Sequence, residues 1–584
     1  MTCTKFKLTT VAGLVLAATN ANAALYKVVE VTPSFADDDK ISEIFGVAIQ
    51  PGKAVNANAQ LPALPDDELP LGCFDSNATN CADSTFKLAG ETRNTVEAVS
   101  YREEVPFAMD APFQYIQERD DFKNYCYREL RYSTCDSWAE KRWATWSKEK
   151  NDLSYVNAKA FVEGGATFES RNTVINSLDN TAQPLGVKSE GGIRNNALFT
   201  TTSGPTGTSE TRAWKAITAS NGSVYNIGSV SEKGPGTDTS DTTFSSKAAI
   251  WDGTTTKKID WIRSGNAQQG DYFAQGSMRS IVESNSVFYG VGYNTADGNG
   301  DRQDMNASVF VSDSLDLTSA TWTTKQVSGA EAKSGSSRDD AIYSNSVAAD
   351  INDNLFAVGY AKRNGYVPEN GSAGNKLFVV TDATNPTATF LSGGIFFSGS
   401  SGEAKAVNNY NEFVGQIDAE TTREVSGRER RHRGFIYPYN VSSSDDARRL
   451  DIFNGQAWWL DDLTNDGDVS GENNKFRIID ATDINDAGVI SATAIKCMID
   501  TNGNGRGDKD QAYDSTSHNS YCGGASSNAV EEVVAVKLVP IAGATKADIQ
   551  ARSADSEKVD RQGGSLGWLS LTVLGLLGFR RKFK

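Results

Sequence analysis

A diverged internal repeat sets the strongest limit on how this chain can fold. In each copy an Asn ends one apolar run, and in four of the five copies a Gly follows seven residues later, within the next apolar run. Copies of such a pattern that recur along the chain at intervals of tens of residues predict an array of similar supersecondary units. The copies are Asn221 with Gly228, Asn285 with Gly292, Asn352 with Gly359, Asn408 with Gly415, and Asn485 with Ala492 in the Gly place.

Each copy predicts a β-hairpin. In the clearest copy, Val347 to Gly359, two apolar runs flank a turn that is rich in Asn and Asp. Such side chains cap backbone groups in turns or accept a positive φ. The Gly on the returning strand permits the close approach of a neighbouring backbone.

Two further strands are expected after each of the first four hairpins. They cover residues 247–251 and 257–262, 307–311 and 322–327, 376–380 and 387–391, and 434–437 and 448–452. Repeated units of four strands are typical of propeller blades. We therefore predict an all-β fold, a β-propeller of six or seven four-stranded blades over residues 24–544, with one or two blades in the less regular stretch 40–210.

The last hairpin lacks a fourth strand of its own. It is followed by the apolar run 533–539, and no further strand is evident. Residues Ala24 to Val31 form an apolar segment near the start of the chain. We predict that this segment supplies the missing strand and closes the ring, which removes two sheet edges that would favour aggregation.

Both ends of the chain carry targeting features. Lys5 and Lys7, the apolar run 11–18 and Ala21-Asn22-Ala23 predict a signal peptide over 1–23, removed by signal peptidase after Ala23. At the other end, Gly563-Gly564 precedes an apolar stretch of 14 residues and a basic cluster. A comfortable membrane span needs about 20 residues, so this stretch is a marginal anchor.

The tail 563–584 resembles the GlyGly-CTERM sorting signal of Gram-negative bacteria. This resemblance implies cleavage near Gly563 and Gly564 by a rhomboid-type protease and display at the cell surface. The alternative is an uncleaved inner-membrane anchor that faces the periplasm. Residues 545–562 are polar without periodicity and are interpreted as a flexible stalk before the tail.

The hairpins, each followed by a short aromatic strand, resemble the HAF repeat of bacterial extracellular proteins. With the start Tyr26-Lys27-Val28-Val29-Glu30 and the tail, the chain resembles an uncharacterised exported domain-of-unknown-function family of Gram-negative, gammaproteobacterial-type bacteria. That family implies no known activity and no catalytic residues.

Six cysteines remain after the signal peptide. An even number in an exported chain predicts disulfides. Proximity favours three local pairs over the alternatives, and zinc ligation is disfavoured because no C-x-x-C occurs. The favoured pairs are Cys73–Cys81, Cys126–Cys135 and Cys497–Cys522.

A charged and aromatic segment over about 112–157 predicts a small helical insertion that Cys126 and Cys135 link together. It serves either as a cap on the propeller or as a face for a partner.

The chain is acidic, and its net charge moves from −17 to about −23 when the signal and tail are removed. This charge argues against nucleic-acid binding and suits cations. The loop 500–510 resembles the front of calcium loops of the dockerin type, with Gly at position 6 but Gln511 where a Glu is usual and Asp510 just before it. The alternative is a solvated loop without metal. The predicted calcium ligands are Asp500, Asn502, Asn504, Arg506 through its carbonyl, and Asp508.

One dense basic patch interrupts this acidity, in the predicted loop between the second and third strands of the fourth clear blade. Its arginines are suited to carboxylate or phosphate groups. A solvated charged loop is the alternative. The patch comprises Arg428, Arg430, Arg431 and Arg433 around His432.

Catalysis has little support in the sequence. The only two histidines, His432 and His518, lie in polar stretches, and 74 acidic residues make any carboxylate pairing uninformative. We therefore expect a non-catalytic binding or scaffolding protein of the bacterial cell envelope, with envelope glycans or proteins as partners. The alternative is a carbohydrate-active hydrolase or lyase that uses carboxylates at the propeller mouth.

Overall fold

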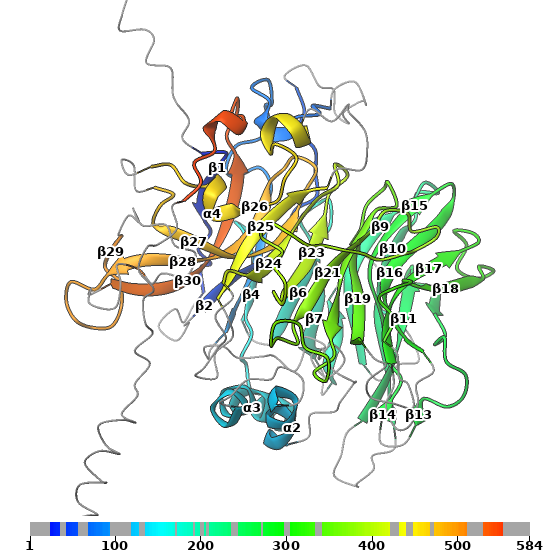
Figure 1. Cartoon of the computed structure of the whole chain (residues 1–584). Helices are drawn as coiled ribbons and strands as arrows, with labels where there is room; N and C mark the ends of the chain where they lie inside the picture. The colour runs from blue at the N-terminus through cyan, green and yellow to red at the C-terminus, as the bar shows by residue number, and fades with distance from the viewer. Residues whose placement is uncertain are drawn as a thin grey trace, which may run out of the picture.

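The computed structural model describes residues 24–35, 43–56, 68–93, 118–127, 135–152, 154–169, 172–190, 193–198, 204–205, 210–234, 243–269, 272–296, 304–332, 342–420, 431–439, 448–467, 472–510, 522 and 529–552. Over these ranges the chain is mostly antiparallel β-strands arranged as a β-propeller (Figure 1). The predicted all-β propeller is therefore confirmed.

Four blades are separate antiparallel sheets whose strands follow chain order. The first has β9 (Glu210–Thr218), β10 (Val224–Gly234), β11 (Thr243–Trp251) and β12 (Thr256–Lys258). The second has β15 (Gly276–Ser284), β16 (Val287–Ala296), β17 (Asp304–Ser312) and β18 (Trp322–Gln326). The third has β19 (Tyr343–Ile351), β20 (Ala357–Arg363), β21 (Asn375–Val380) and β22 (Thr389–Phe390). The fourth has β23 (Gly402–Val407), β24 (Glu412–Asp418), β25 (His432–Pro438) and β26 (Trp458–Trp459).

A nine-stranded sheet contains the fifth blade. That blade has β27 (Phe476–Ile484), β28 (Ile490–Ile499), β30 (Ala529–Pro540) and β1 (Tyr26–Glu30), and β29 (Lys509–Asp510) pairs with β28. The sheet continues into β2 (Glu43–Ile49), β3 (Leu88–Arg93), β4 (Ala160–Val162) and β5 (Thr167–Phe168). A three-stranded sheet has β6 (Thr173–Leu178), β7 (Pro184–Glu190) and β8 (Ile193–Leu198), and a ribbon has β13 (Gln268–Gln269) and β14 (Tyr272–Phe273).

The predicted blade number of six or seven is not matched, because the described residues form five blades of four strands. The strands β2 to β5 are not a separate sheet, since Glu43 of β2 pairs in parallel with Val533 of β30. The sheet β6–β8 has three strands rather than four. Neither unit carries the clear Asn and Gly repeat from which the other blades were predicted.

The predicted closure by the start of the chain is confirmed. Strand β1 pairs antiparallel with β30, from Tyr26 opposite Pro540 to Glu30 opposite Val536. Asn473 covers the outer edge of β1, because its amide accepts a hydrogen bond from Val28 N at 2.9 Å and donates one to Tyr26 O at 2.8 Å. In Figure 1 the blue β1 lies beside the orange-red β30.

The repeat Asn side chains cap their own turns and bridge neighbouring blades. Asn352 Oδ1 accepts the backbone N–H of Asn354 and of Phe356, which is the capping role expected from the sequence. Its Nδ2 donates to the carbonyl of Asn408 at 2.8 Å. Asn408 donates in the same way to Asn485 O at 3.2 Å, and Asn485 to Gln50 O at 3.0 Å. Successive blades are thus linked through one repeated residue.

One predicted strand is wrong. Residues Arg448–Ile452 form a π-helical turn, and the fourth strand of that blade is β26 instead. A strand would point Arg448 and Arg449 to opposite faces, whereas the turn buries both. Arg448 Nη2 lies 2.7 Å from Glu412 Oε2, and Arg449 Nη1 donates to Tyr439 O at 2.6 Å.

The helical insertion and the disulfides agree with the sequence analysis. Helices α2 (Arg119–Tyr125) and α3 (Cys135–Asn151) pack together through Phe122, Trp138 and Trp146. The short helix α4 (Leu460–Leu463) follows β26, and 3₁₀ turns cover Gly72–Phe74 and Lys546–Asp548. All three disulfides pair as expected, as Cys73–Cys81, Cys126–Cys135 and Cys497–Cys522.

The start of the predicted stalk is ordered against the propeller, which corrects its boundary. Arg552 is buried, and its Nε donates to Asp461 O at 2.8 Å while its Nη2 donates to Asn474 Oδ1 at 3.0 Å. A segment that ends in a buried arginine is not a flexible linker. Residues 545–552 therefore do not belong to a flexible stalk, and the rest of the predicted stalk, 553–562, lies outside the described residues.

Candidate functional site

Seven strands share a β-bulge at one position, and each bulge leaves one residue without a partner in the ladder. Opposite each bulge lies the returning strand of the same unit, where six of the seven units have a glycine, including the predicted Gly228, Gly292, Gly359 and Gly415. Bulges redirect side chains. The bulge residues are Val47, Asn176, Trp214, Arg279, Ala349, Lys405 and Thr482.

The repeat glycines are required by these bulges. A Cβ on Gly415 would lie 1.9 Å from Glu403 O, and one on Gly228 would lie 1.9 Å from Arg212 O. Both contacts are with backbone atoms, which cannot turn aside. The predicted role of the repeat glycine, close approach of a neighbouring backbone, is confirmed.

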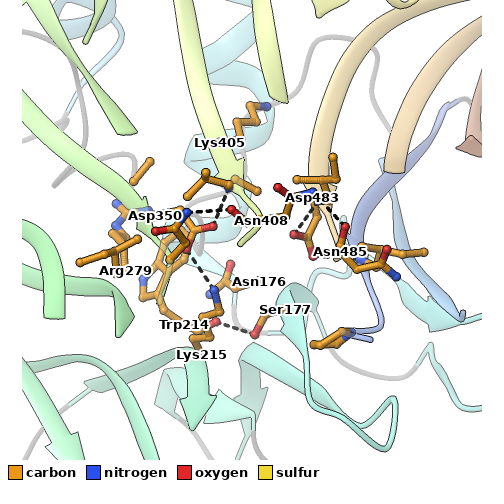
Figure 2. Close-up of a pocket in the computed structure, with 18 of the residues that line it drawn as sticks. Asn176, Ser177, Trp214, Lys215, Arg279, Asp350, Lys405, Asn408, Asp483 and Asn485 are labelled. Carbon is orange, nitrogen blue, oxygen red and sulfur yellow. Dashed lines mark hydrogen bonds and ion pairs between the residues drawn. The ribbon is translucent and has the colours of Figure 1, made fainter. Parts of the chain in front are cut away.

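All seven bulge residues line one cavity of about 560 Å³, which we call the central pocket. Figure 2 labels four of them, Asn176, Trp214, Arg279 and Lys405. The repeat turns at Asn352, Asn408 and Asn485 also line it. Its walls therefore come from strands spread along almost the whole chain. This volume falls in the range of small-molecule sites.

An ion pair crosses the central pocket between two blades. Lys215 Nζ, on β9, lies 3.0 Å from Asp350 Oδ1, on β19. The other oxygen of Asp350 accepts a hydrogen bond from Val407 N of β23 at 2.8 Å. The Lys215 side chain is 36% exposed, and the residue lines the cavity. Burial lowers the pKa of this ammonium, but the charges of Asp350 and Asp483 outweigh burial and the net pKa is raised.

Asp483 is the second carboxyl of the same charge cluster. Its Oδ2 accepts the N–H of Ile49 at 2.9 Å, across the junction between β27 and β2, and its Oδ1 accepts the N–H of Ile484 at 2.9 Å. Burial raises the pKa of Asp483 to about 7, Lys215 opposes the rise, and Asp350 adds to it. This carboxyl therefore changes its protonation near neutral pH.

Three of the bulge residues, Trp214, Arg279 and Lys405, bring aromatic and basic groups to the wall of the central pocket. The Arg279 guanidinium stacks 3.7 Å from the ring centre of Trp214. Lys405 Nζ lies 2.5 Å from Asp480 Oδ2 and 3.5 Å from Glu403 Oε2. Burial lowers the pKa of Lys405, but Asp480 and Glu403 outweigh it and the net pKa is raised. The pocket thus presents both charge signs beside an aromatic ring.

The predicted calcium loop is exposed and organised by its own hydrogen bonds. Asp500 accepts the N–H groups of Gly503 and Gly505, both at 2.7 Å, and the Gly505 N–H is the main cause that lowers its pKa. Asp508 accepts the side-chain amide of Asn502 at 2.8 Å. Arg506 N donates to Asn504 Oδ1 at 2.8 Å. The oxygens of Asp500, Asn504 and Asp508 thus face groups of the same loop.

Asp510, the residue next to the usual twelfth position, lies apart from this loop. It pairs with Lys475 at 2.7 Å and with Lys496 at 3.4 Å. Over the described ranges, His, Cys, Asp and Glu side chains form no group of three or more that could hold a metal ion. Calcium binding by the loop stays a prediction.

The basic patch is divided by the structure, which corrects the prediction for Arg433. Arg433 is buried, and its Nε lies 3.3 Å from Asp461 Oδ2, so it does not face an external anion. Arg431 is partly exposed at the end of the predicted loop. Arg428 and Arg430 lie outside the described residues, as do the processing residues Ala23, Gly563 and Gly564.

The sequence analysis missed the residues of the central pocket. A signal was present, because Asp350 and Asp483 each stand two residues before a repeat Asn, in the sequences Asp-Ile-Asn. The bulge residues have no common residue type, and only the opposing glycines mark their places.

Fold and cavity together define a β-propeller with a charged central pocket. The chain belongs to the family described as Protein of unknown function (DUF3466), whose model matches residues 230–582. The search of curated proteins finds no match. Among the described residues, no helix is both long and apolar enough to cross a membrane.

Proposed function

We propose that this protein binds a small polar ligand, such as a sugar unit of an envelope glycan, in its central pocket without chemical conversion. The main support for this proposal is that bulge residues from seven strands line one cavity of about 560 Å³. A side chain that leaves its ladder to line a cavity contributes little to its own sheet. Lys215, Arg279 and Trp214 supply the charged and aromatic groups that a polar ligand with a flat face would contact.

Non-catalytic binding is favoured because Asp350 and Asp483, the two pocket carboxyls whose charges act most strongly on Lys215, already serve the fold. Asp350 links Lys215 to Val407 N, and Asp483 links Ile49 N to Ile484 N. Each carboxylate therefore accepts hydrogen bonds through both of its oxygens. A nucleophile would have to give up such bonds during the reaction.

The experiment is a glycan array followed by titration calorimetry on the purified protein. We expect the double variant Lys215→Met with Asp350→Asn, which removes the pair together, to lose about tenfold or more in affinity. The matched control is Lys325→Met, because Lys325 Nζ donates only to Thr384 O on the outer surface. Equal binding by all three proteins would place the ligand elsewhere.

The second candidate is a carbohydrate-active hydrolase or lyase. Asp350 and Asp483 are two of the five carboxyls that line the central pocket, and the pKa of Asp483 near 7 suits a general acid or base. Asp483→Asn would then abolish turnover of a bound glycan while binding persists. A wild-type protein that binds the glycan and leaves it unchanged would exclude this candidate for that glycan.

We also propose that the protein is exported and sorted to the cell surface, with signal peptidase and a rhomboid-type protease as its processing partners and HAF-like repeats in its ring. Cleavage after Ala23 would leave the complete closing strand β1, which begins at Tyr26. If cleavage at Gly563 and Gly564 does not occur, the tail would retain the protein at the inner membrane.

Finally, we propose that β2–β5 and β6–β8 fill the sixth and seventh places of the ring. Both units carry the same bulge as the five clear blades, at Val47 and Asn176. Gln50, at the end of β2, continues the linkage of the repeat Asn residues by donating to Asn180 O at 2.9 Å.

A further inference from the structure

A second cavity, the side cavity, lies between two neighbouring blades. It has a volume of about 290 Å³ and is bounded by the turn between β20 and β21 and by the loop 391–401 between β22 and β23. The repeat Asn turns join the first and second strands of each blade, so the turn between the second and third strands lies at the opposite face. The side cavity is therefore separate from the central pocket.

Three charged side chains meet at this cavity, and their net charge is positive. Arg363 Nη1 and Lys376 Nζ both lie 3.6 Å from Glu369 Oε2. The other oxygen of Glu369 accepts the Ser398 hydroxyl at 2.6 Å. That hydrogen bond is the main cause that holds the pKa of Glu369 below its usual value, with Lys376 and Arg363 contributing. Glu369 is thus a stable anion facing two cations, in a chain with a net charge of −17.

Both cations keep donor capacity toward the cavity. Arg363 uses Nε for Val367 O at 2.7 Å and also interacts with the Tyr343 side chain, while its Nη1 contact with Glu369, at 3.6 Å, is longer than a hydrogen bond. The contact of Lys376 Nζ with Glu369 is likewise longer than a hydrogen bond, and the Lys376 side chain is 31% exposed. The loop wall carries Gly393 and Gly394 at positive φ, and a Cβ on either would meet no atom within 4 Å. The wall is open, and its backbone is accessible to a ligand.

We propose that the side cavity binds an anionic group, a carboxylate or a sulfate ester, of the kind that acidic polysaccharides carry. The anion would lie between Arg363 and Lys376. Its oxygens would accept hydrogen bonds from those N–H groups of the two side chains that Glu369 does not engage. Charge-assisted hydrogen bonds to such oxygens are among the strongest in proteins. This site does not depend on the ligand of the central pocket.

The first test is calorimetric titration of the full-length protein with inorganic sulfate at constant ionic strength. We expect saturable binding that weakens about tenfold in Lys376→Met. The control Lys325→Met removes one lysine charge from a neighbouring blade and should bind like the wild type. Glu369→Gln should tighten binding, because it removes the competing anion. This opposite sign separates a ligand site from a merely structural ion cluster.

Two acidic ligands identify the source of the anion. A sulfated oligosaccharide and a uronate oligosaccharide are compared with a neutral one of equal length, again in wild type and Lys376→Met. Preference for either acidic ligand, lost in the variant, supports the proposal and names the group. The proposal is overturned if sulfate does not bind, if Lys376→Met and Lys325→Met bind it alike, or if the neutral ligand binds as well.

Discussion

At the scale of single residues, the glycines and acids of the repeat have different structural roles. Each repeat glycine gives room for the bulge opposite it, as Gly415 does for the carbonyl of Glu403. Asp350 accepts the backbone N–H of Val407 in the next blade, and Asp483 accepts the backbone N–H of Ile49 in β2. The bulge opposite Gly415 places Lys405 at the central pocket, and the hydrogen bond from Ile49 N places Asp483 there. The residues that hold the fold together are therefore also those that form the pocket.

Gly415→Ala tests the bulge. The added methyl would meet the Glu403 carbonyl, and the strand would have to shift, so we expect a loss of about 1–3 kcal/mol in the free energy of unfolding. Denaturant unfolding measures it. Gly165→Ala is the control, because its nearest atom would be Val162 O at an ordinary 3.6 Å. Equal loss in both variants would mean that the bulge imposes no special demand.

Asp483→Asn tests the buried carboxyl. An acid whose pKa is raised in the folded chain binds its proton more tightly there, so its contribution to stability grows as the pH falls through about 7. We expect the Tm of the wild type to rise relative to the variant between about pH 8 and about pH 5. Parallel Tm profiles for the two proteins would contradict the raised pKa.

At the scale of elements, the closing strand is held by its neighbours in the ring, whereas the exposed loop is held by its own hydrogen bonds. Strand β1 has five residues, and it is held by β30 on one side and by the Asn473 amide on the other. Such a short strand owes its position to these partners rather than to its own propensity. The loop 500–508 sits at the far end of β28 and depends on hydrogen bonds within itself.

Asn473→Ala tests the edge of β1. It leaves Val28 N and Tyr26 O without the amide, and an unsatisfied buried backbone group costs about 1–3 kcal/mol. We expect a loss of that size or somewhat more in urea unfolding. Asn77→Ala is the control, because Asn77 is exposed and its amide bonds only nearby Asp75. No difference between the variants would show that β30 alone holds the strand.

Asp500→Ala tests the calcium prediction. If the loop binds the ion, calcium should raise the Tm of the wild type and leave that of the variant unchanged, since only the native loop gains binding energy. The melting of both proteins is measured with calcium and with a chelator. An equal response of the two proteins to calcium would show that this loop does not bind the ion.

At the scale of the whole molecule, the periodic parts were predictable and the irregular parts were not. The hairpins around Asn352 and Asn408, the closing strand and the three disulfides follow from spacing and composition. The turn at Arg448 was missed because its reason is a buried glutamate far away in the sequence, Glu412. The central pocket was missed for the same reason, since Lys215 and Asp350 meet only after the ring forms.

The processing proposal also belongs to this scale. Intact mass of the protein from its native membrane should give a chain that starts at Ala24 and ends near Gly563. Replacing Gly563 and Gly564 by larger residues should retain the tail and move the protein to the inner-membrane fraction. An uncleaved wild-type chain in that fraction would instead make it a periplasm-facing protein.

The pairing of β1 with β30 has a consequence in time. A ribosome makes Tyr26 among the first residues of the propeller and Pro540 among the last, yet the two are direct partners. The molecule therefore cannot complete its ring until β30 is made, and every nascent copy passes through a stage in which β1 and β28 lack their shared partner β30. Such unpaired edges pair readily with other chains. Newly made protein is thus most vulnerable just before its final strand emerges.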